Sequence, residues 1–181
     1  MSNKVIFPTI VAILLMASSS HVSAQMSDEA FDQLKSLAGE WSGTLHFSPG
    51  EHLERLAIND EQTLKLTYSL RSGGSSILEE SDTDGVAMLT IFNKQEESLL
   101  VTHYCALMNK PVAKLVSSAD GVLSFTTDAA RSGLQEGNDE YVKSWTLSLE
   151  PENPDQFTYE YTVISPDMTE WTAKAIVSRV K

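Results

Sequence analysis

The chain has 181 residues, with 13 Lys and Arg against 25 Asp and Glu, so its formal net charge at pH 7 is −12. An acidic surface repels nucleic acids and anionic membranes, so we expect neither as a partner. Cys105 is the single cysteine in the sequence, which excludes an intramolecular disulfide and a zinc site built from several cysteines.

The first 24 residues have the three regions of a secretory signal peptide. Lys4 is the only charged side chain, an apolar run follows from Val5 to Ala17, and the segment ends with Val22-Ser23-Ala24. Pro8 interrupts the run, which is shorter than the roughly 18 apolar residues of a membrane anchor. We therefore expect cleavage after Ala24, a periplasmic or secreted protein without membrane insertion, and one mature domain over residues 25–181.

The next segment, SDEAFDQLKSLAGEW, predicts a short amphipathic helix over about Asp28 to Ala38. Ser27 is a typical N-cap, and the acidic residues that follow it are favoured in the first turn by the helix dipole. Apolar residues recur at helical spacing at Phe31, Leu34 and Leu37. Gly39 is a residue type that commonly ends a helix.

After Gly39 the sequence alternates between apolar and polar residues with period two, which is typical of strands with one buried face. The pattern is clear in EWSGTLHF, EQTLKLTYSL and QFTYEYTV, and turn-forming segments such as SDTDG, SSADG and PENPD separate such runs. The strands recur about every ten residues, and no long helical segment interrupts them. The sequence therefore predicts one all-β domain, an antiparallel meander β-barrel of about 8–10 strands with a short N-terminal helix.

The stretch FDQLKSLAGEWSGTL resembles the beginning of proteins of the calycin superfamily, the lipocalins and fatty-acid-binding proteins. Those proteins place a short helix before a Gly-x-Trp motif, here Gly39-Glu40-Trp41, and pack a basic residue of the last strand across the Trp. The resemblance implies structural roles for Gly39, Trp41 and Arg179. The chain also resembles exported lipocalin-like bacterial proteins of unassigned function, which carry a THYC strand followed by an Asn-x-Pro turn.

The strand that contains THYC has two faces, and either could point into the barrel. One face would place His103 and Cys105 inside, and the other would place Tyr104 inside. His103 and Cys105 are two residues apart, about 6.5–7 Å along a strand, which is too far for a Cys–His nucleophilic pair. A buried, hydrogen-bonded His103 beside a cysteine that acts as a small hydrophobic residue is the alternative to a binding role.

Other polar and aromatic residues are weaker candidates. Asn109 lies in the turn after this strand, and the rings of Trp145 and Tyr159 would line a cavity if the barrel contains one. Glu79 and Glu80 are adjacent on a strand and point to opposite faces, so we expect a solvated face or a turn there rather than a two-carboxylate site. The histidines lack metal-ligand spacing, and we expect no metal site.

The sequence favours an exported, monomeric, calycin-like barrel that binds a small apolar or amphipathic molecule in its interior. Its candidate ligand-binding residues are His103, Tyr104, Cys105, Asn109, Trp145 and Tyr159. Three alternatives stay open: a haem-binding barrel with His103 as axial ligand, an enzyme for a small substrate at the barrel mouth, and a filled structural barrel. We assign no catalytic residues, because no acid, base and orienting group occur at a suitable spacing.

Overall fold

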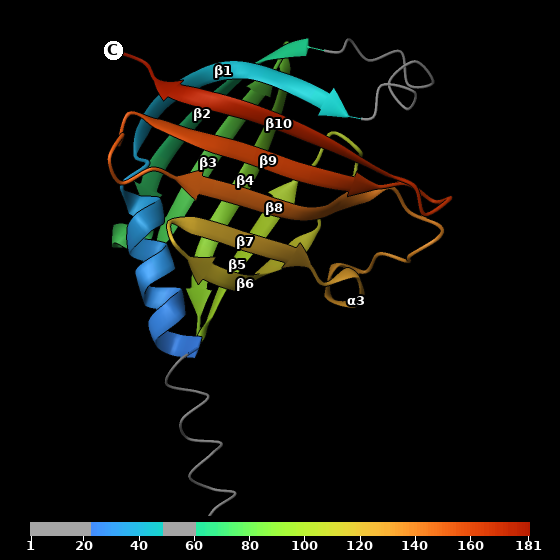
Figure 1. Ribbon diagram of the computed structural model, residues 1–181. Helices are drawn as coiled ribbons and strands as arrows, with labels where there is room; N and C mark the ends of the chain where they lie inside the picture. The colour runs from blue at the N-terminus through green and yellow to red at the C-terminus, as the bar shows by residue number, and fades with distance from the viewer. Residues whose placement is uncertain (1–22, 49–60) are drawn as a thin grey trace, which may run out of the picture.

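The computed structural model describes residues 23–48 and 61–181, and these ranges form a closed antiparallel β-barrel (Figure 1). Each strand pairs with its neighbours in sequence, and β1 pairs with β10 to close the barrel. The predicted meander barrel with an N-terminal helix is therefore confirmed. None of the helices in the described part of the chain is long and apolar enough to cross a membrane.

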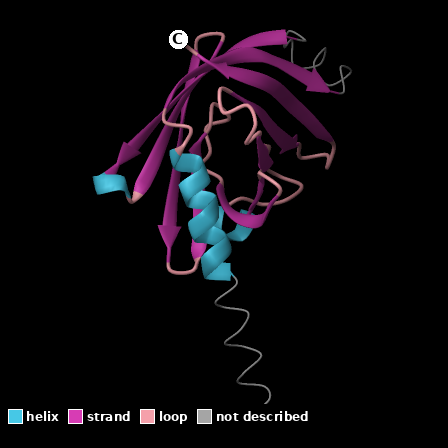
Figure 2. Cartoon of the chain, turned by 60° about the vertical axis from the view of Figure 1, so that its left-hand side comes forward, coloured by secondary structure: helices cyan, strands magenta, loops and turns pink. Residues whose placement is uncertain are grey.

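Ten strands form the wall of the barrel, and Figure 2 shows that helices contribute little to it. The strands are β1 (Gly39–Ser48), β2 (Glu61–Arg71), β3 (Ser76–Thr83), β4 (Val86–Gln95), β5 (Ser98–Tyr104), β6 (Val112–Ala119), β7 (Val122–Thr127), β8 (Tyr141–Leu149), β9 (Gln156–Ile164) and β10 (Glu170–Arg179). Two short helices, η1 (Ser72–Gly74) and α3 (Ala129–Ser132), lie in connections.

The N-terminal helix covers residues 23–35, so it begins and ends earlier than the sequence predicts. Ser27 is not its N-cap, because this residue lies inside the helix and its hydroxyl donates a hydrogen bond to the carbonyl of Glu97 (2.9 Å). The apolar side of the helix, including Phe31 and Leu34, is buried. Of the predicted signal peptide, residues 1–22 lie outside the described residues.

Arg179 ties the end of this helix to the last strand and closes one end of the barrel. Its guanidinium carbon lies 4.2 Å from the centroid of the Trp41 ring, which is the contact that the resemblance to calycins implies. Its Nη1 and Nη2 donate to the carbonyls of Ala38 (2.9 Å) and Ser36 (3.2 Å), and the Trp41 indole donates to the carbonyl of Leu37 (2.7 Å). These bonds satisfy carbonyls of the short connection between the helix and β1.

Gly39 is required where the chain passes from the helix into β1. Its φ of +129° lies in a region that side chains with a Cβ rarely adopt. A Cβ at this position would also lie 2.8 Å from Nη1 of Arg179. Replacement of Gly39 would therefore disturb both the backbone and the contact between Arg179 and Trp41.

Aromatic side chains fill the half of the barrel next to this closed end. Trp41 and Phe157 meet edge to face with ring centroids 4.9 Å apart, and Phe92 and Phe125 do so at 5.9 Å. All four side chains are at most 3% exposed. These rings form the aromatic core of the barrel, and the cavity described below lies towards the other end.

Candidate ligand-binding cavity

A cavity of about 470 Å³ occupies the barrel at the end opposite Arg179. Its rim is formed where β1 ends at Phe47, in the β3–β4 turn at Asp84, after β5 at Leu107, and before β8 at Glu140. Its volume lies within the range of small-molecule sites in proteins. The aromatic core thus lies near Arg179, and the cavity lies at the opposite end of the barrel.

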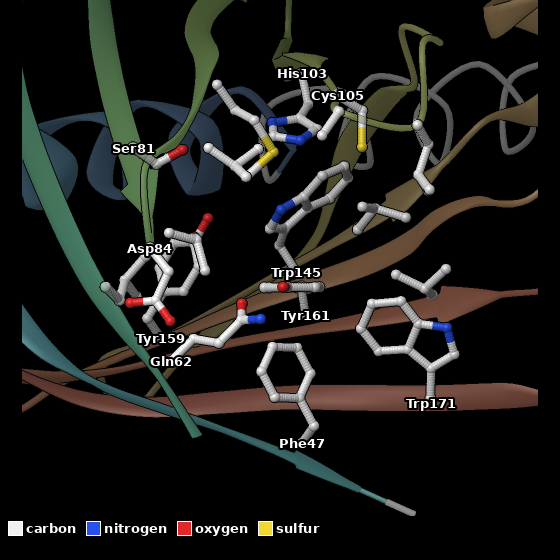
Figure 3. A pocket seen from close by; sticks show the side chains of 18 of the residues that line it. Phe47, Gln62, Ser81, Asp84, His103, Cys105, Trp145, Tyr159, Tyr161 and Trp171 are labelled. Atoms are coloured by element: carbon white, nitrogen blue, oxygen red, sulfur yellow. The ribbon is translucent and has the colours of Figure 1, made fainter. Parts of the chain in front are cut away.

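Aromatic side chains form much of the cavity wall, as Figure 3 shows. Phe47 and Trp171 have ring centroids 5.9 Å apart, and Trp171 and Tyr161 have centroids 6.1 Å apart. Tyr161 in turn contacts Tyr159 at 6.2 Å, and Trp145 lies beside His103. These rings come from β1, β8, β9 and β10, strands that are neighbours in the barrel.

A buried carboxylate lies between the aromatic core and the cavity. Glu79 is 0% exposed and accepts hydrogen bonds from the hydroxyls of Tyr68 (2.6 Å), Thr90 (2.9 Å) and Tyr159 (3.2 Å). Burial raises the pKa of Glu79, and the three hydroxyl donors oppose that shift. The expectation of a solvated face at this position is therefore wrong for Glu79, because β3 turns this residue inward and three other strands supply its partners.

His103 is joined to this carboxylate through Thr90. Its Nδ1 lies 2.9 Å from Oγ1 of Thr90, and its side chain is almost fully buried. Because the single Thr90 proton is donated to Glu79, Nδ1 must donate to Oγ1, which leaves Nε2 as an acceptor. Burial lowers the pKa of His103 to about 4, so the imidazole is neutral at physiological pH.

The hydroxyl of Ser81 and the Nε2 of His103 are polar groups of the cavity wall that lack partners in the described part of the chain. The hydroxyl of Ser81 is buried, lines the cavity and makes no hydrogen bond there. The Nε2 of His103, also on the cavity wall, makes none of the hydrogen bonds found among the described residues. Buried polar groups in proteins are rarely left unpaired, so these two are available to a molecule in the cavity.

The structure brings four of the predicted ligand-binding residues to the cavity wall: His103, Cys105, Trp145 and Tyr159. Their role in binding stays a prediction. Tyr104 is 47% exposed and faces out of the barrel, so of the two faces that the sequence left open, the one with His103 and Cys105 points inward. Tyr104 is therefore wrong as a candidate for the cavity wall. Asn109 is also outside the cavity wall, because its amide donates to the carbonyl of Glu140 (2.7 Å) and holds the rim.

The sequence did not indicate Ser81 as part of this site, nor Glu79 as a buried carboxylate with Tyr68 and Thr90 as donors. The available signal was the row Ile77, Glu79, Ser81 on one face of β3, where polar residues follow an apolar one. A row of this kind is also typical of a solvated strand face. Only the closed barrel shows that this row of β3 faces the interior rather than the solvent.

Cys105 has the properties of an inert thiol rather than of a nucleophile. It is partly buried, and burial raises its pKa. A thiol with a raised pKa carries little thiolate at neutral pH and reacts slowly. No group of three or more His, Cys, Asp or Glu side chains within the described ranges could hold a metal ion.

The protein is thus a closed antiparallel β-barrel with a cavity at one end. No family model and no curated protein matches the chain. Among solved structures it is similar to a protein of unknown function from the DUF3598 family of Nostoc punctiforme PCC 73102, with a TM-score of 0.53 and 11% identity over 81% of this chain and 48% of that one. The chain thus spans about half the length of that protein, and a likeness at this identity extends to the fold alone.

The chain also matches the protein EF1p2_mFAP2b in a structure bound to DFHBI, with a TM-score of 0.37 and 9% identity over 81% of this chain and 95% of that one. Membership of the calycin superfamily stays a prediction.

Proposed function

We propose that this protein binds one small amphipathic molecule inside the barrel. The observation that carries the proposal is the cavity of about 470 Å³ with an aromatic wall and with polar groups, Ser81 Oγ and His103 Nε2, that have no hydrogen-bond partner among the described residues. An aromatic wall with a few fixed polar groups is the usual composition of a small-molecule site. A filled structural barrel would leave neither the space nor the unpartnered hydroxyl.

The two polar groups indicate how such a molecule would be oriented. Neutral His103 offers an acceptor at Nε2, and the Ser81 hydroxyl can donate or accept. A ligand hydroxyl or amide next to them would satisfy both, at about 1 kcal/mol for each hydrogen bond. The hydrogen bonds from His103 to Thr90 and from Thr90 to Glu79 hold the imidazole in place, so its orientation is established before the ligand enters.

Haem is a poorer fit to the same cavity. His103 Nε2 could approach an iron atom, but the two haem carboxylates would need cationic partners. None of the described residues that line the cavity is Lys or Arg, and its rim carries Asp84 and Glu140. We therefore favour an organic ligand without acidic groups over haem.

Binding also fits the chemistry of the site better than turnover does. A histidine with a pKa of about 4 is a weak general base at neutral pH. The raised pKa of Cys105 makes the thiol a poor nucleophile. The residues on the cavity wall are thus better suited to hold a molecule than to transform it.

A titration with N-phenyl-1-naphthylamine, a neutral fluorescent probe of apolar sites, tests the proposal. We expect saturable one-to-one binding, and we expect Ser81→Leu to weaken it about tenfold or more by filling the cavity, a change of about 1.4 kcal/mol. Glu80→Leu is the matched control, because the exposed Glu80 lies next to Ser81 on the outer face of β3. Equal binding by both variants would show that the probe sits elsewhere, and no saturable binding would overturn the proposal.

We propose further that the protein is exported, as the N-terminal pattern from Lys4 to Ala24 predicts. When the full-length chain is expressed in an exporting host, the intact mass of the purified protein should correspond to residues 25–181. A protein that retains Met1 to Ala24 in the envelope fraction would contradict cleavage. Its recovery only from the cytoplasm would contradict export.

A further inference from the structure

The charged groups on the cavity wall are all of one sign. Asp84 and Glu140 lie at the rim, and none of the described lining residues is Lys or Arg. Glu79 lies just behind the wall, hydrogen-bonded to Tyr159, which lines the cavity. A ligand that enters the barrel therefore passes carboxylates and meets no cation among these residues.

Glu140 is held in place by neutral donors. Its Oε1 accepts a hydrogen bond from the Ser165 hydroxyl (3.0 Å) and another from the indole N–H of Trp171 (3.5 Å). It forms no salt bridge within the described ranges, whereas Glu170, which is not on the cavity wall, is paired with Lys143. The Glu140 carboxylate is thus positioned on the cavity wall with its charge uncompensated.

The Trp171 ring beside this carboxylate is the middle one of three aromatic rings in contact. Trp171, which donates to Glu140, also contacts Phe47 and Tyr161, with centroid distances of 5.9 and 6.1 Å and interplanar angles of 49° and 68°. Figure 3 shows these rings side by side on the cavity wall. Inclined aromatic faces attract a cation through their quadrupoles, most strongly where water is excluded.

We propose that the ligand of this cavity is a cationic amphiphile whose ammonium group is held at the rim by Glu140 and the rings of Phe47, Tyr161 and Trp171. The inference rests on the proposed binding function and specifies the class of ligand. The apolar part of the molecule lies along the aromatic wall, towards Ser81 and His103. The unpartnered Ser81 hydroxyl is an independent sign that the inner part of the cavity receives a ligand.

The same arrangement disfavours fatty acids and other anionic amphiphiles. A carboxylate at the rim would lie near Glu140 and Asp84, and at the inner end it would lie near Glu79. In either position it would lose hydration without gaining an opposite charge, which is unfavourable. Neutral amphiphiles should fall between the cationic and the anionic class.

Three ligands with the same chain, octylammonium, octanol and octanoate, test this inference by displacing N-phenyl-1-naphthylamine at pH 7.5. We expect octylammonium to displace the probe at a concentration about tenfold lower than octanoate. The titrations are made in 0.15 M salt, where a Debye length of about 8 Å screens the general attraction of an acidic protein for cations. Glu140→Gln should reduce the preference for octylammonium over octanoate to less than about threefold and leave octanol unchanged.

Glu136→Gln is the matched control, because Glu136 is an exposed acid of the same loop outside the cavity wall, and it should keep the full preference. Phe47→Leu retains apolar volume but removes one ring, and it should weaken octylammonium more than octanol. Equal or tighter binding of octanoate would overturn the cationic class while leaving the binding function intact. A preference that survives Glu140→Gln would overturn the assigned position of the ammonium. Failure of all three ligands and of the probe itself would overturn the binding function too.

Discussion

Between pH 7.5 and pH 5 the protein should lose about 2 kcal/mol of unfolding free energy through His103 alone. Burial lowers the pKa of this histidine from 6.5 to about 4 in the folded protein. His103 therefore binds a proton near pH 6.5 in the unfolded chain, whereas in the folded protein it stays neutral until the pH falls towards 4. The stabilisation is complete above pH 6.5 and disappears as the pH falls towards 4, with a total of about 3 kcal/mol for the full shift.

Urea denaturation at pH 7.5 and pH 5 measures this loss, and His103→Gln should remove most of it because Gln does not titrate. His46→Gln is the matched control. His46 is an exposed histidine on β1 beside Glu61, so its replacement changes the number of histidines without touching the buried site of His103. Identical pH profiles for His103→Gln and the unmodified protein would contradict the buried neutral state of His103.

Glu79 contributes to the same pH profile with the opposite sign. Its pKa is raised in the folded protein, so the folded state binds a proton more readily than the unfolded chain does. Its contribution to stability is fully present below the unfolded pKa of a glutamate and is lost as the pH rises through the folded pKa. Comparison of His103→Gln with the unmodified protein is therefore required to isolate the histidine.

Tyr68→Phe should destabilise the protein by about 1.5–3 kcal/mol, the range for a buried hydrogen bond to a charged group. The Tyr68 hydroxyl donates to Oε2 of Glu79 at 2.6 Å, and both side chains are at most 2% exposed. Removal of this donor leaves one oxygen of the buried carboxylate without its partner. The pKa of Glu79 should rise further, because a hydrogen bond to its charged form has been lost.

Tyr161→Phe is the matched control for this measurement. Tyr161 is also an inward-facing tyrosine, and its hydroxyl makes no hydrogen bond among the described residues that would be lost. We expect a change within about 0.5 kcal/mol in urea denaturation at pH 7.5. An equal effect of the two substitutions would show that the Tyr68–Glu79 bond adds nothing beyond packing.

The sequence by itself determined the strands, the meander order and the closed end of the barrel. Period-two alternation is a local property, so a run such as QFTYEYTV identifies β9 without knowledge of its neighbours. The Gly-x-Trp motif and Arg179 lie in the first and last strands, and the pairing of Trp41 with Arg179 in β1 and β10 brings them together at the closed end of the barrel. The strands could be predicted because alternation depends on one short segment, whereas the roles of Trp41 and Arg179 were implied by the resemblance to calycins.

Only the tertiary structure decided which residues face the cavity. Both faces of β5 are partly apolar, so the inward place of His103 and the outward place of Tyr104 depend on how the whole barrel closes. Glu79 is buried because hydroxyls on β2, β4 and β9 converge on it, and no pattern within β3 contains those partners. The free energy of burying the Glu79 charge depends on hydrogen-bond donors that lie far apart in the sequence. The position of this carboxylate behind the cavity wall could therefore be identified only from the closed barrel.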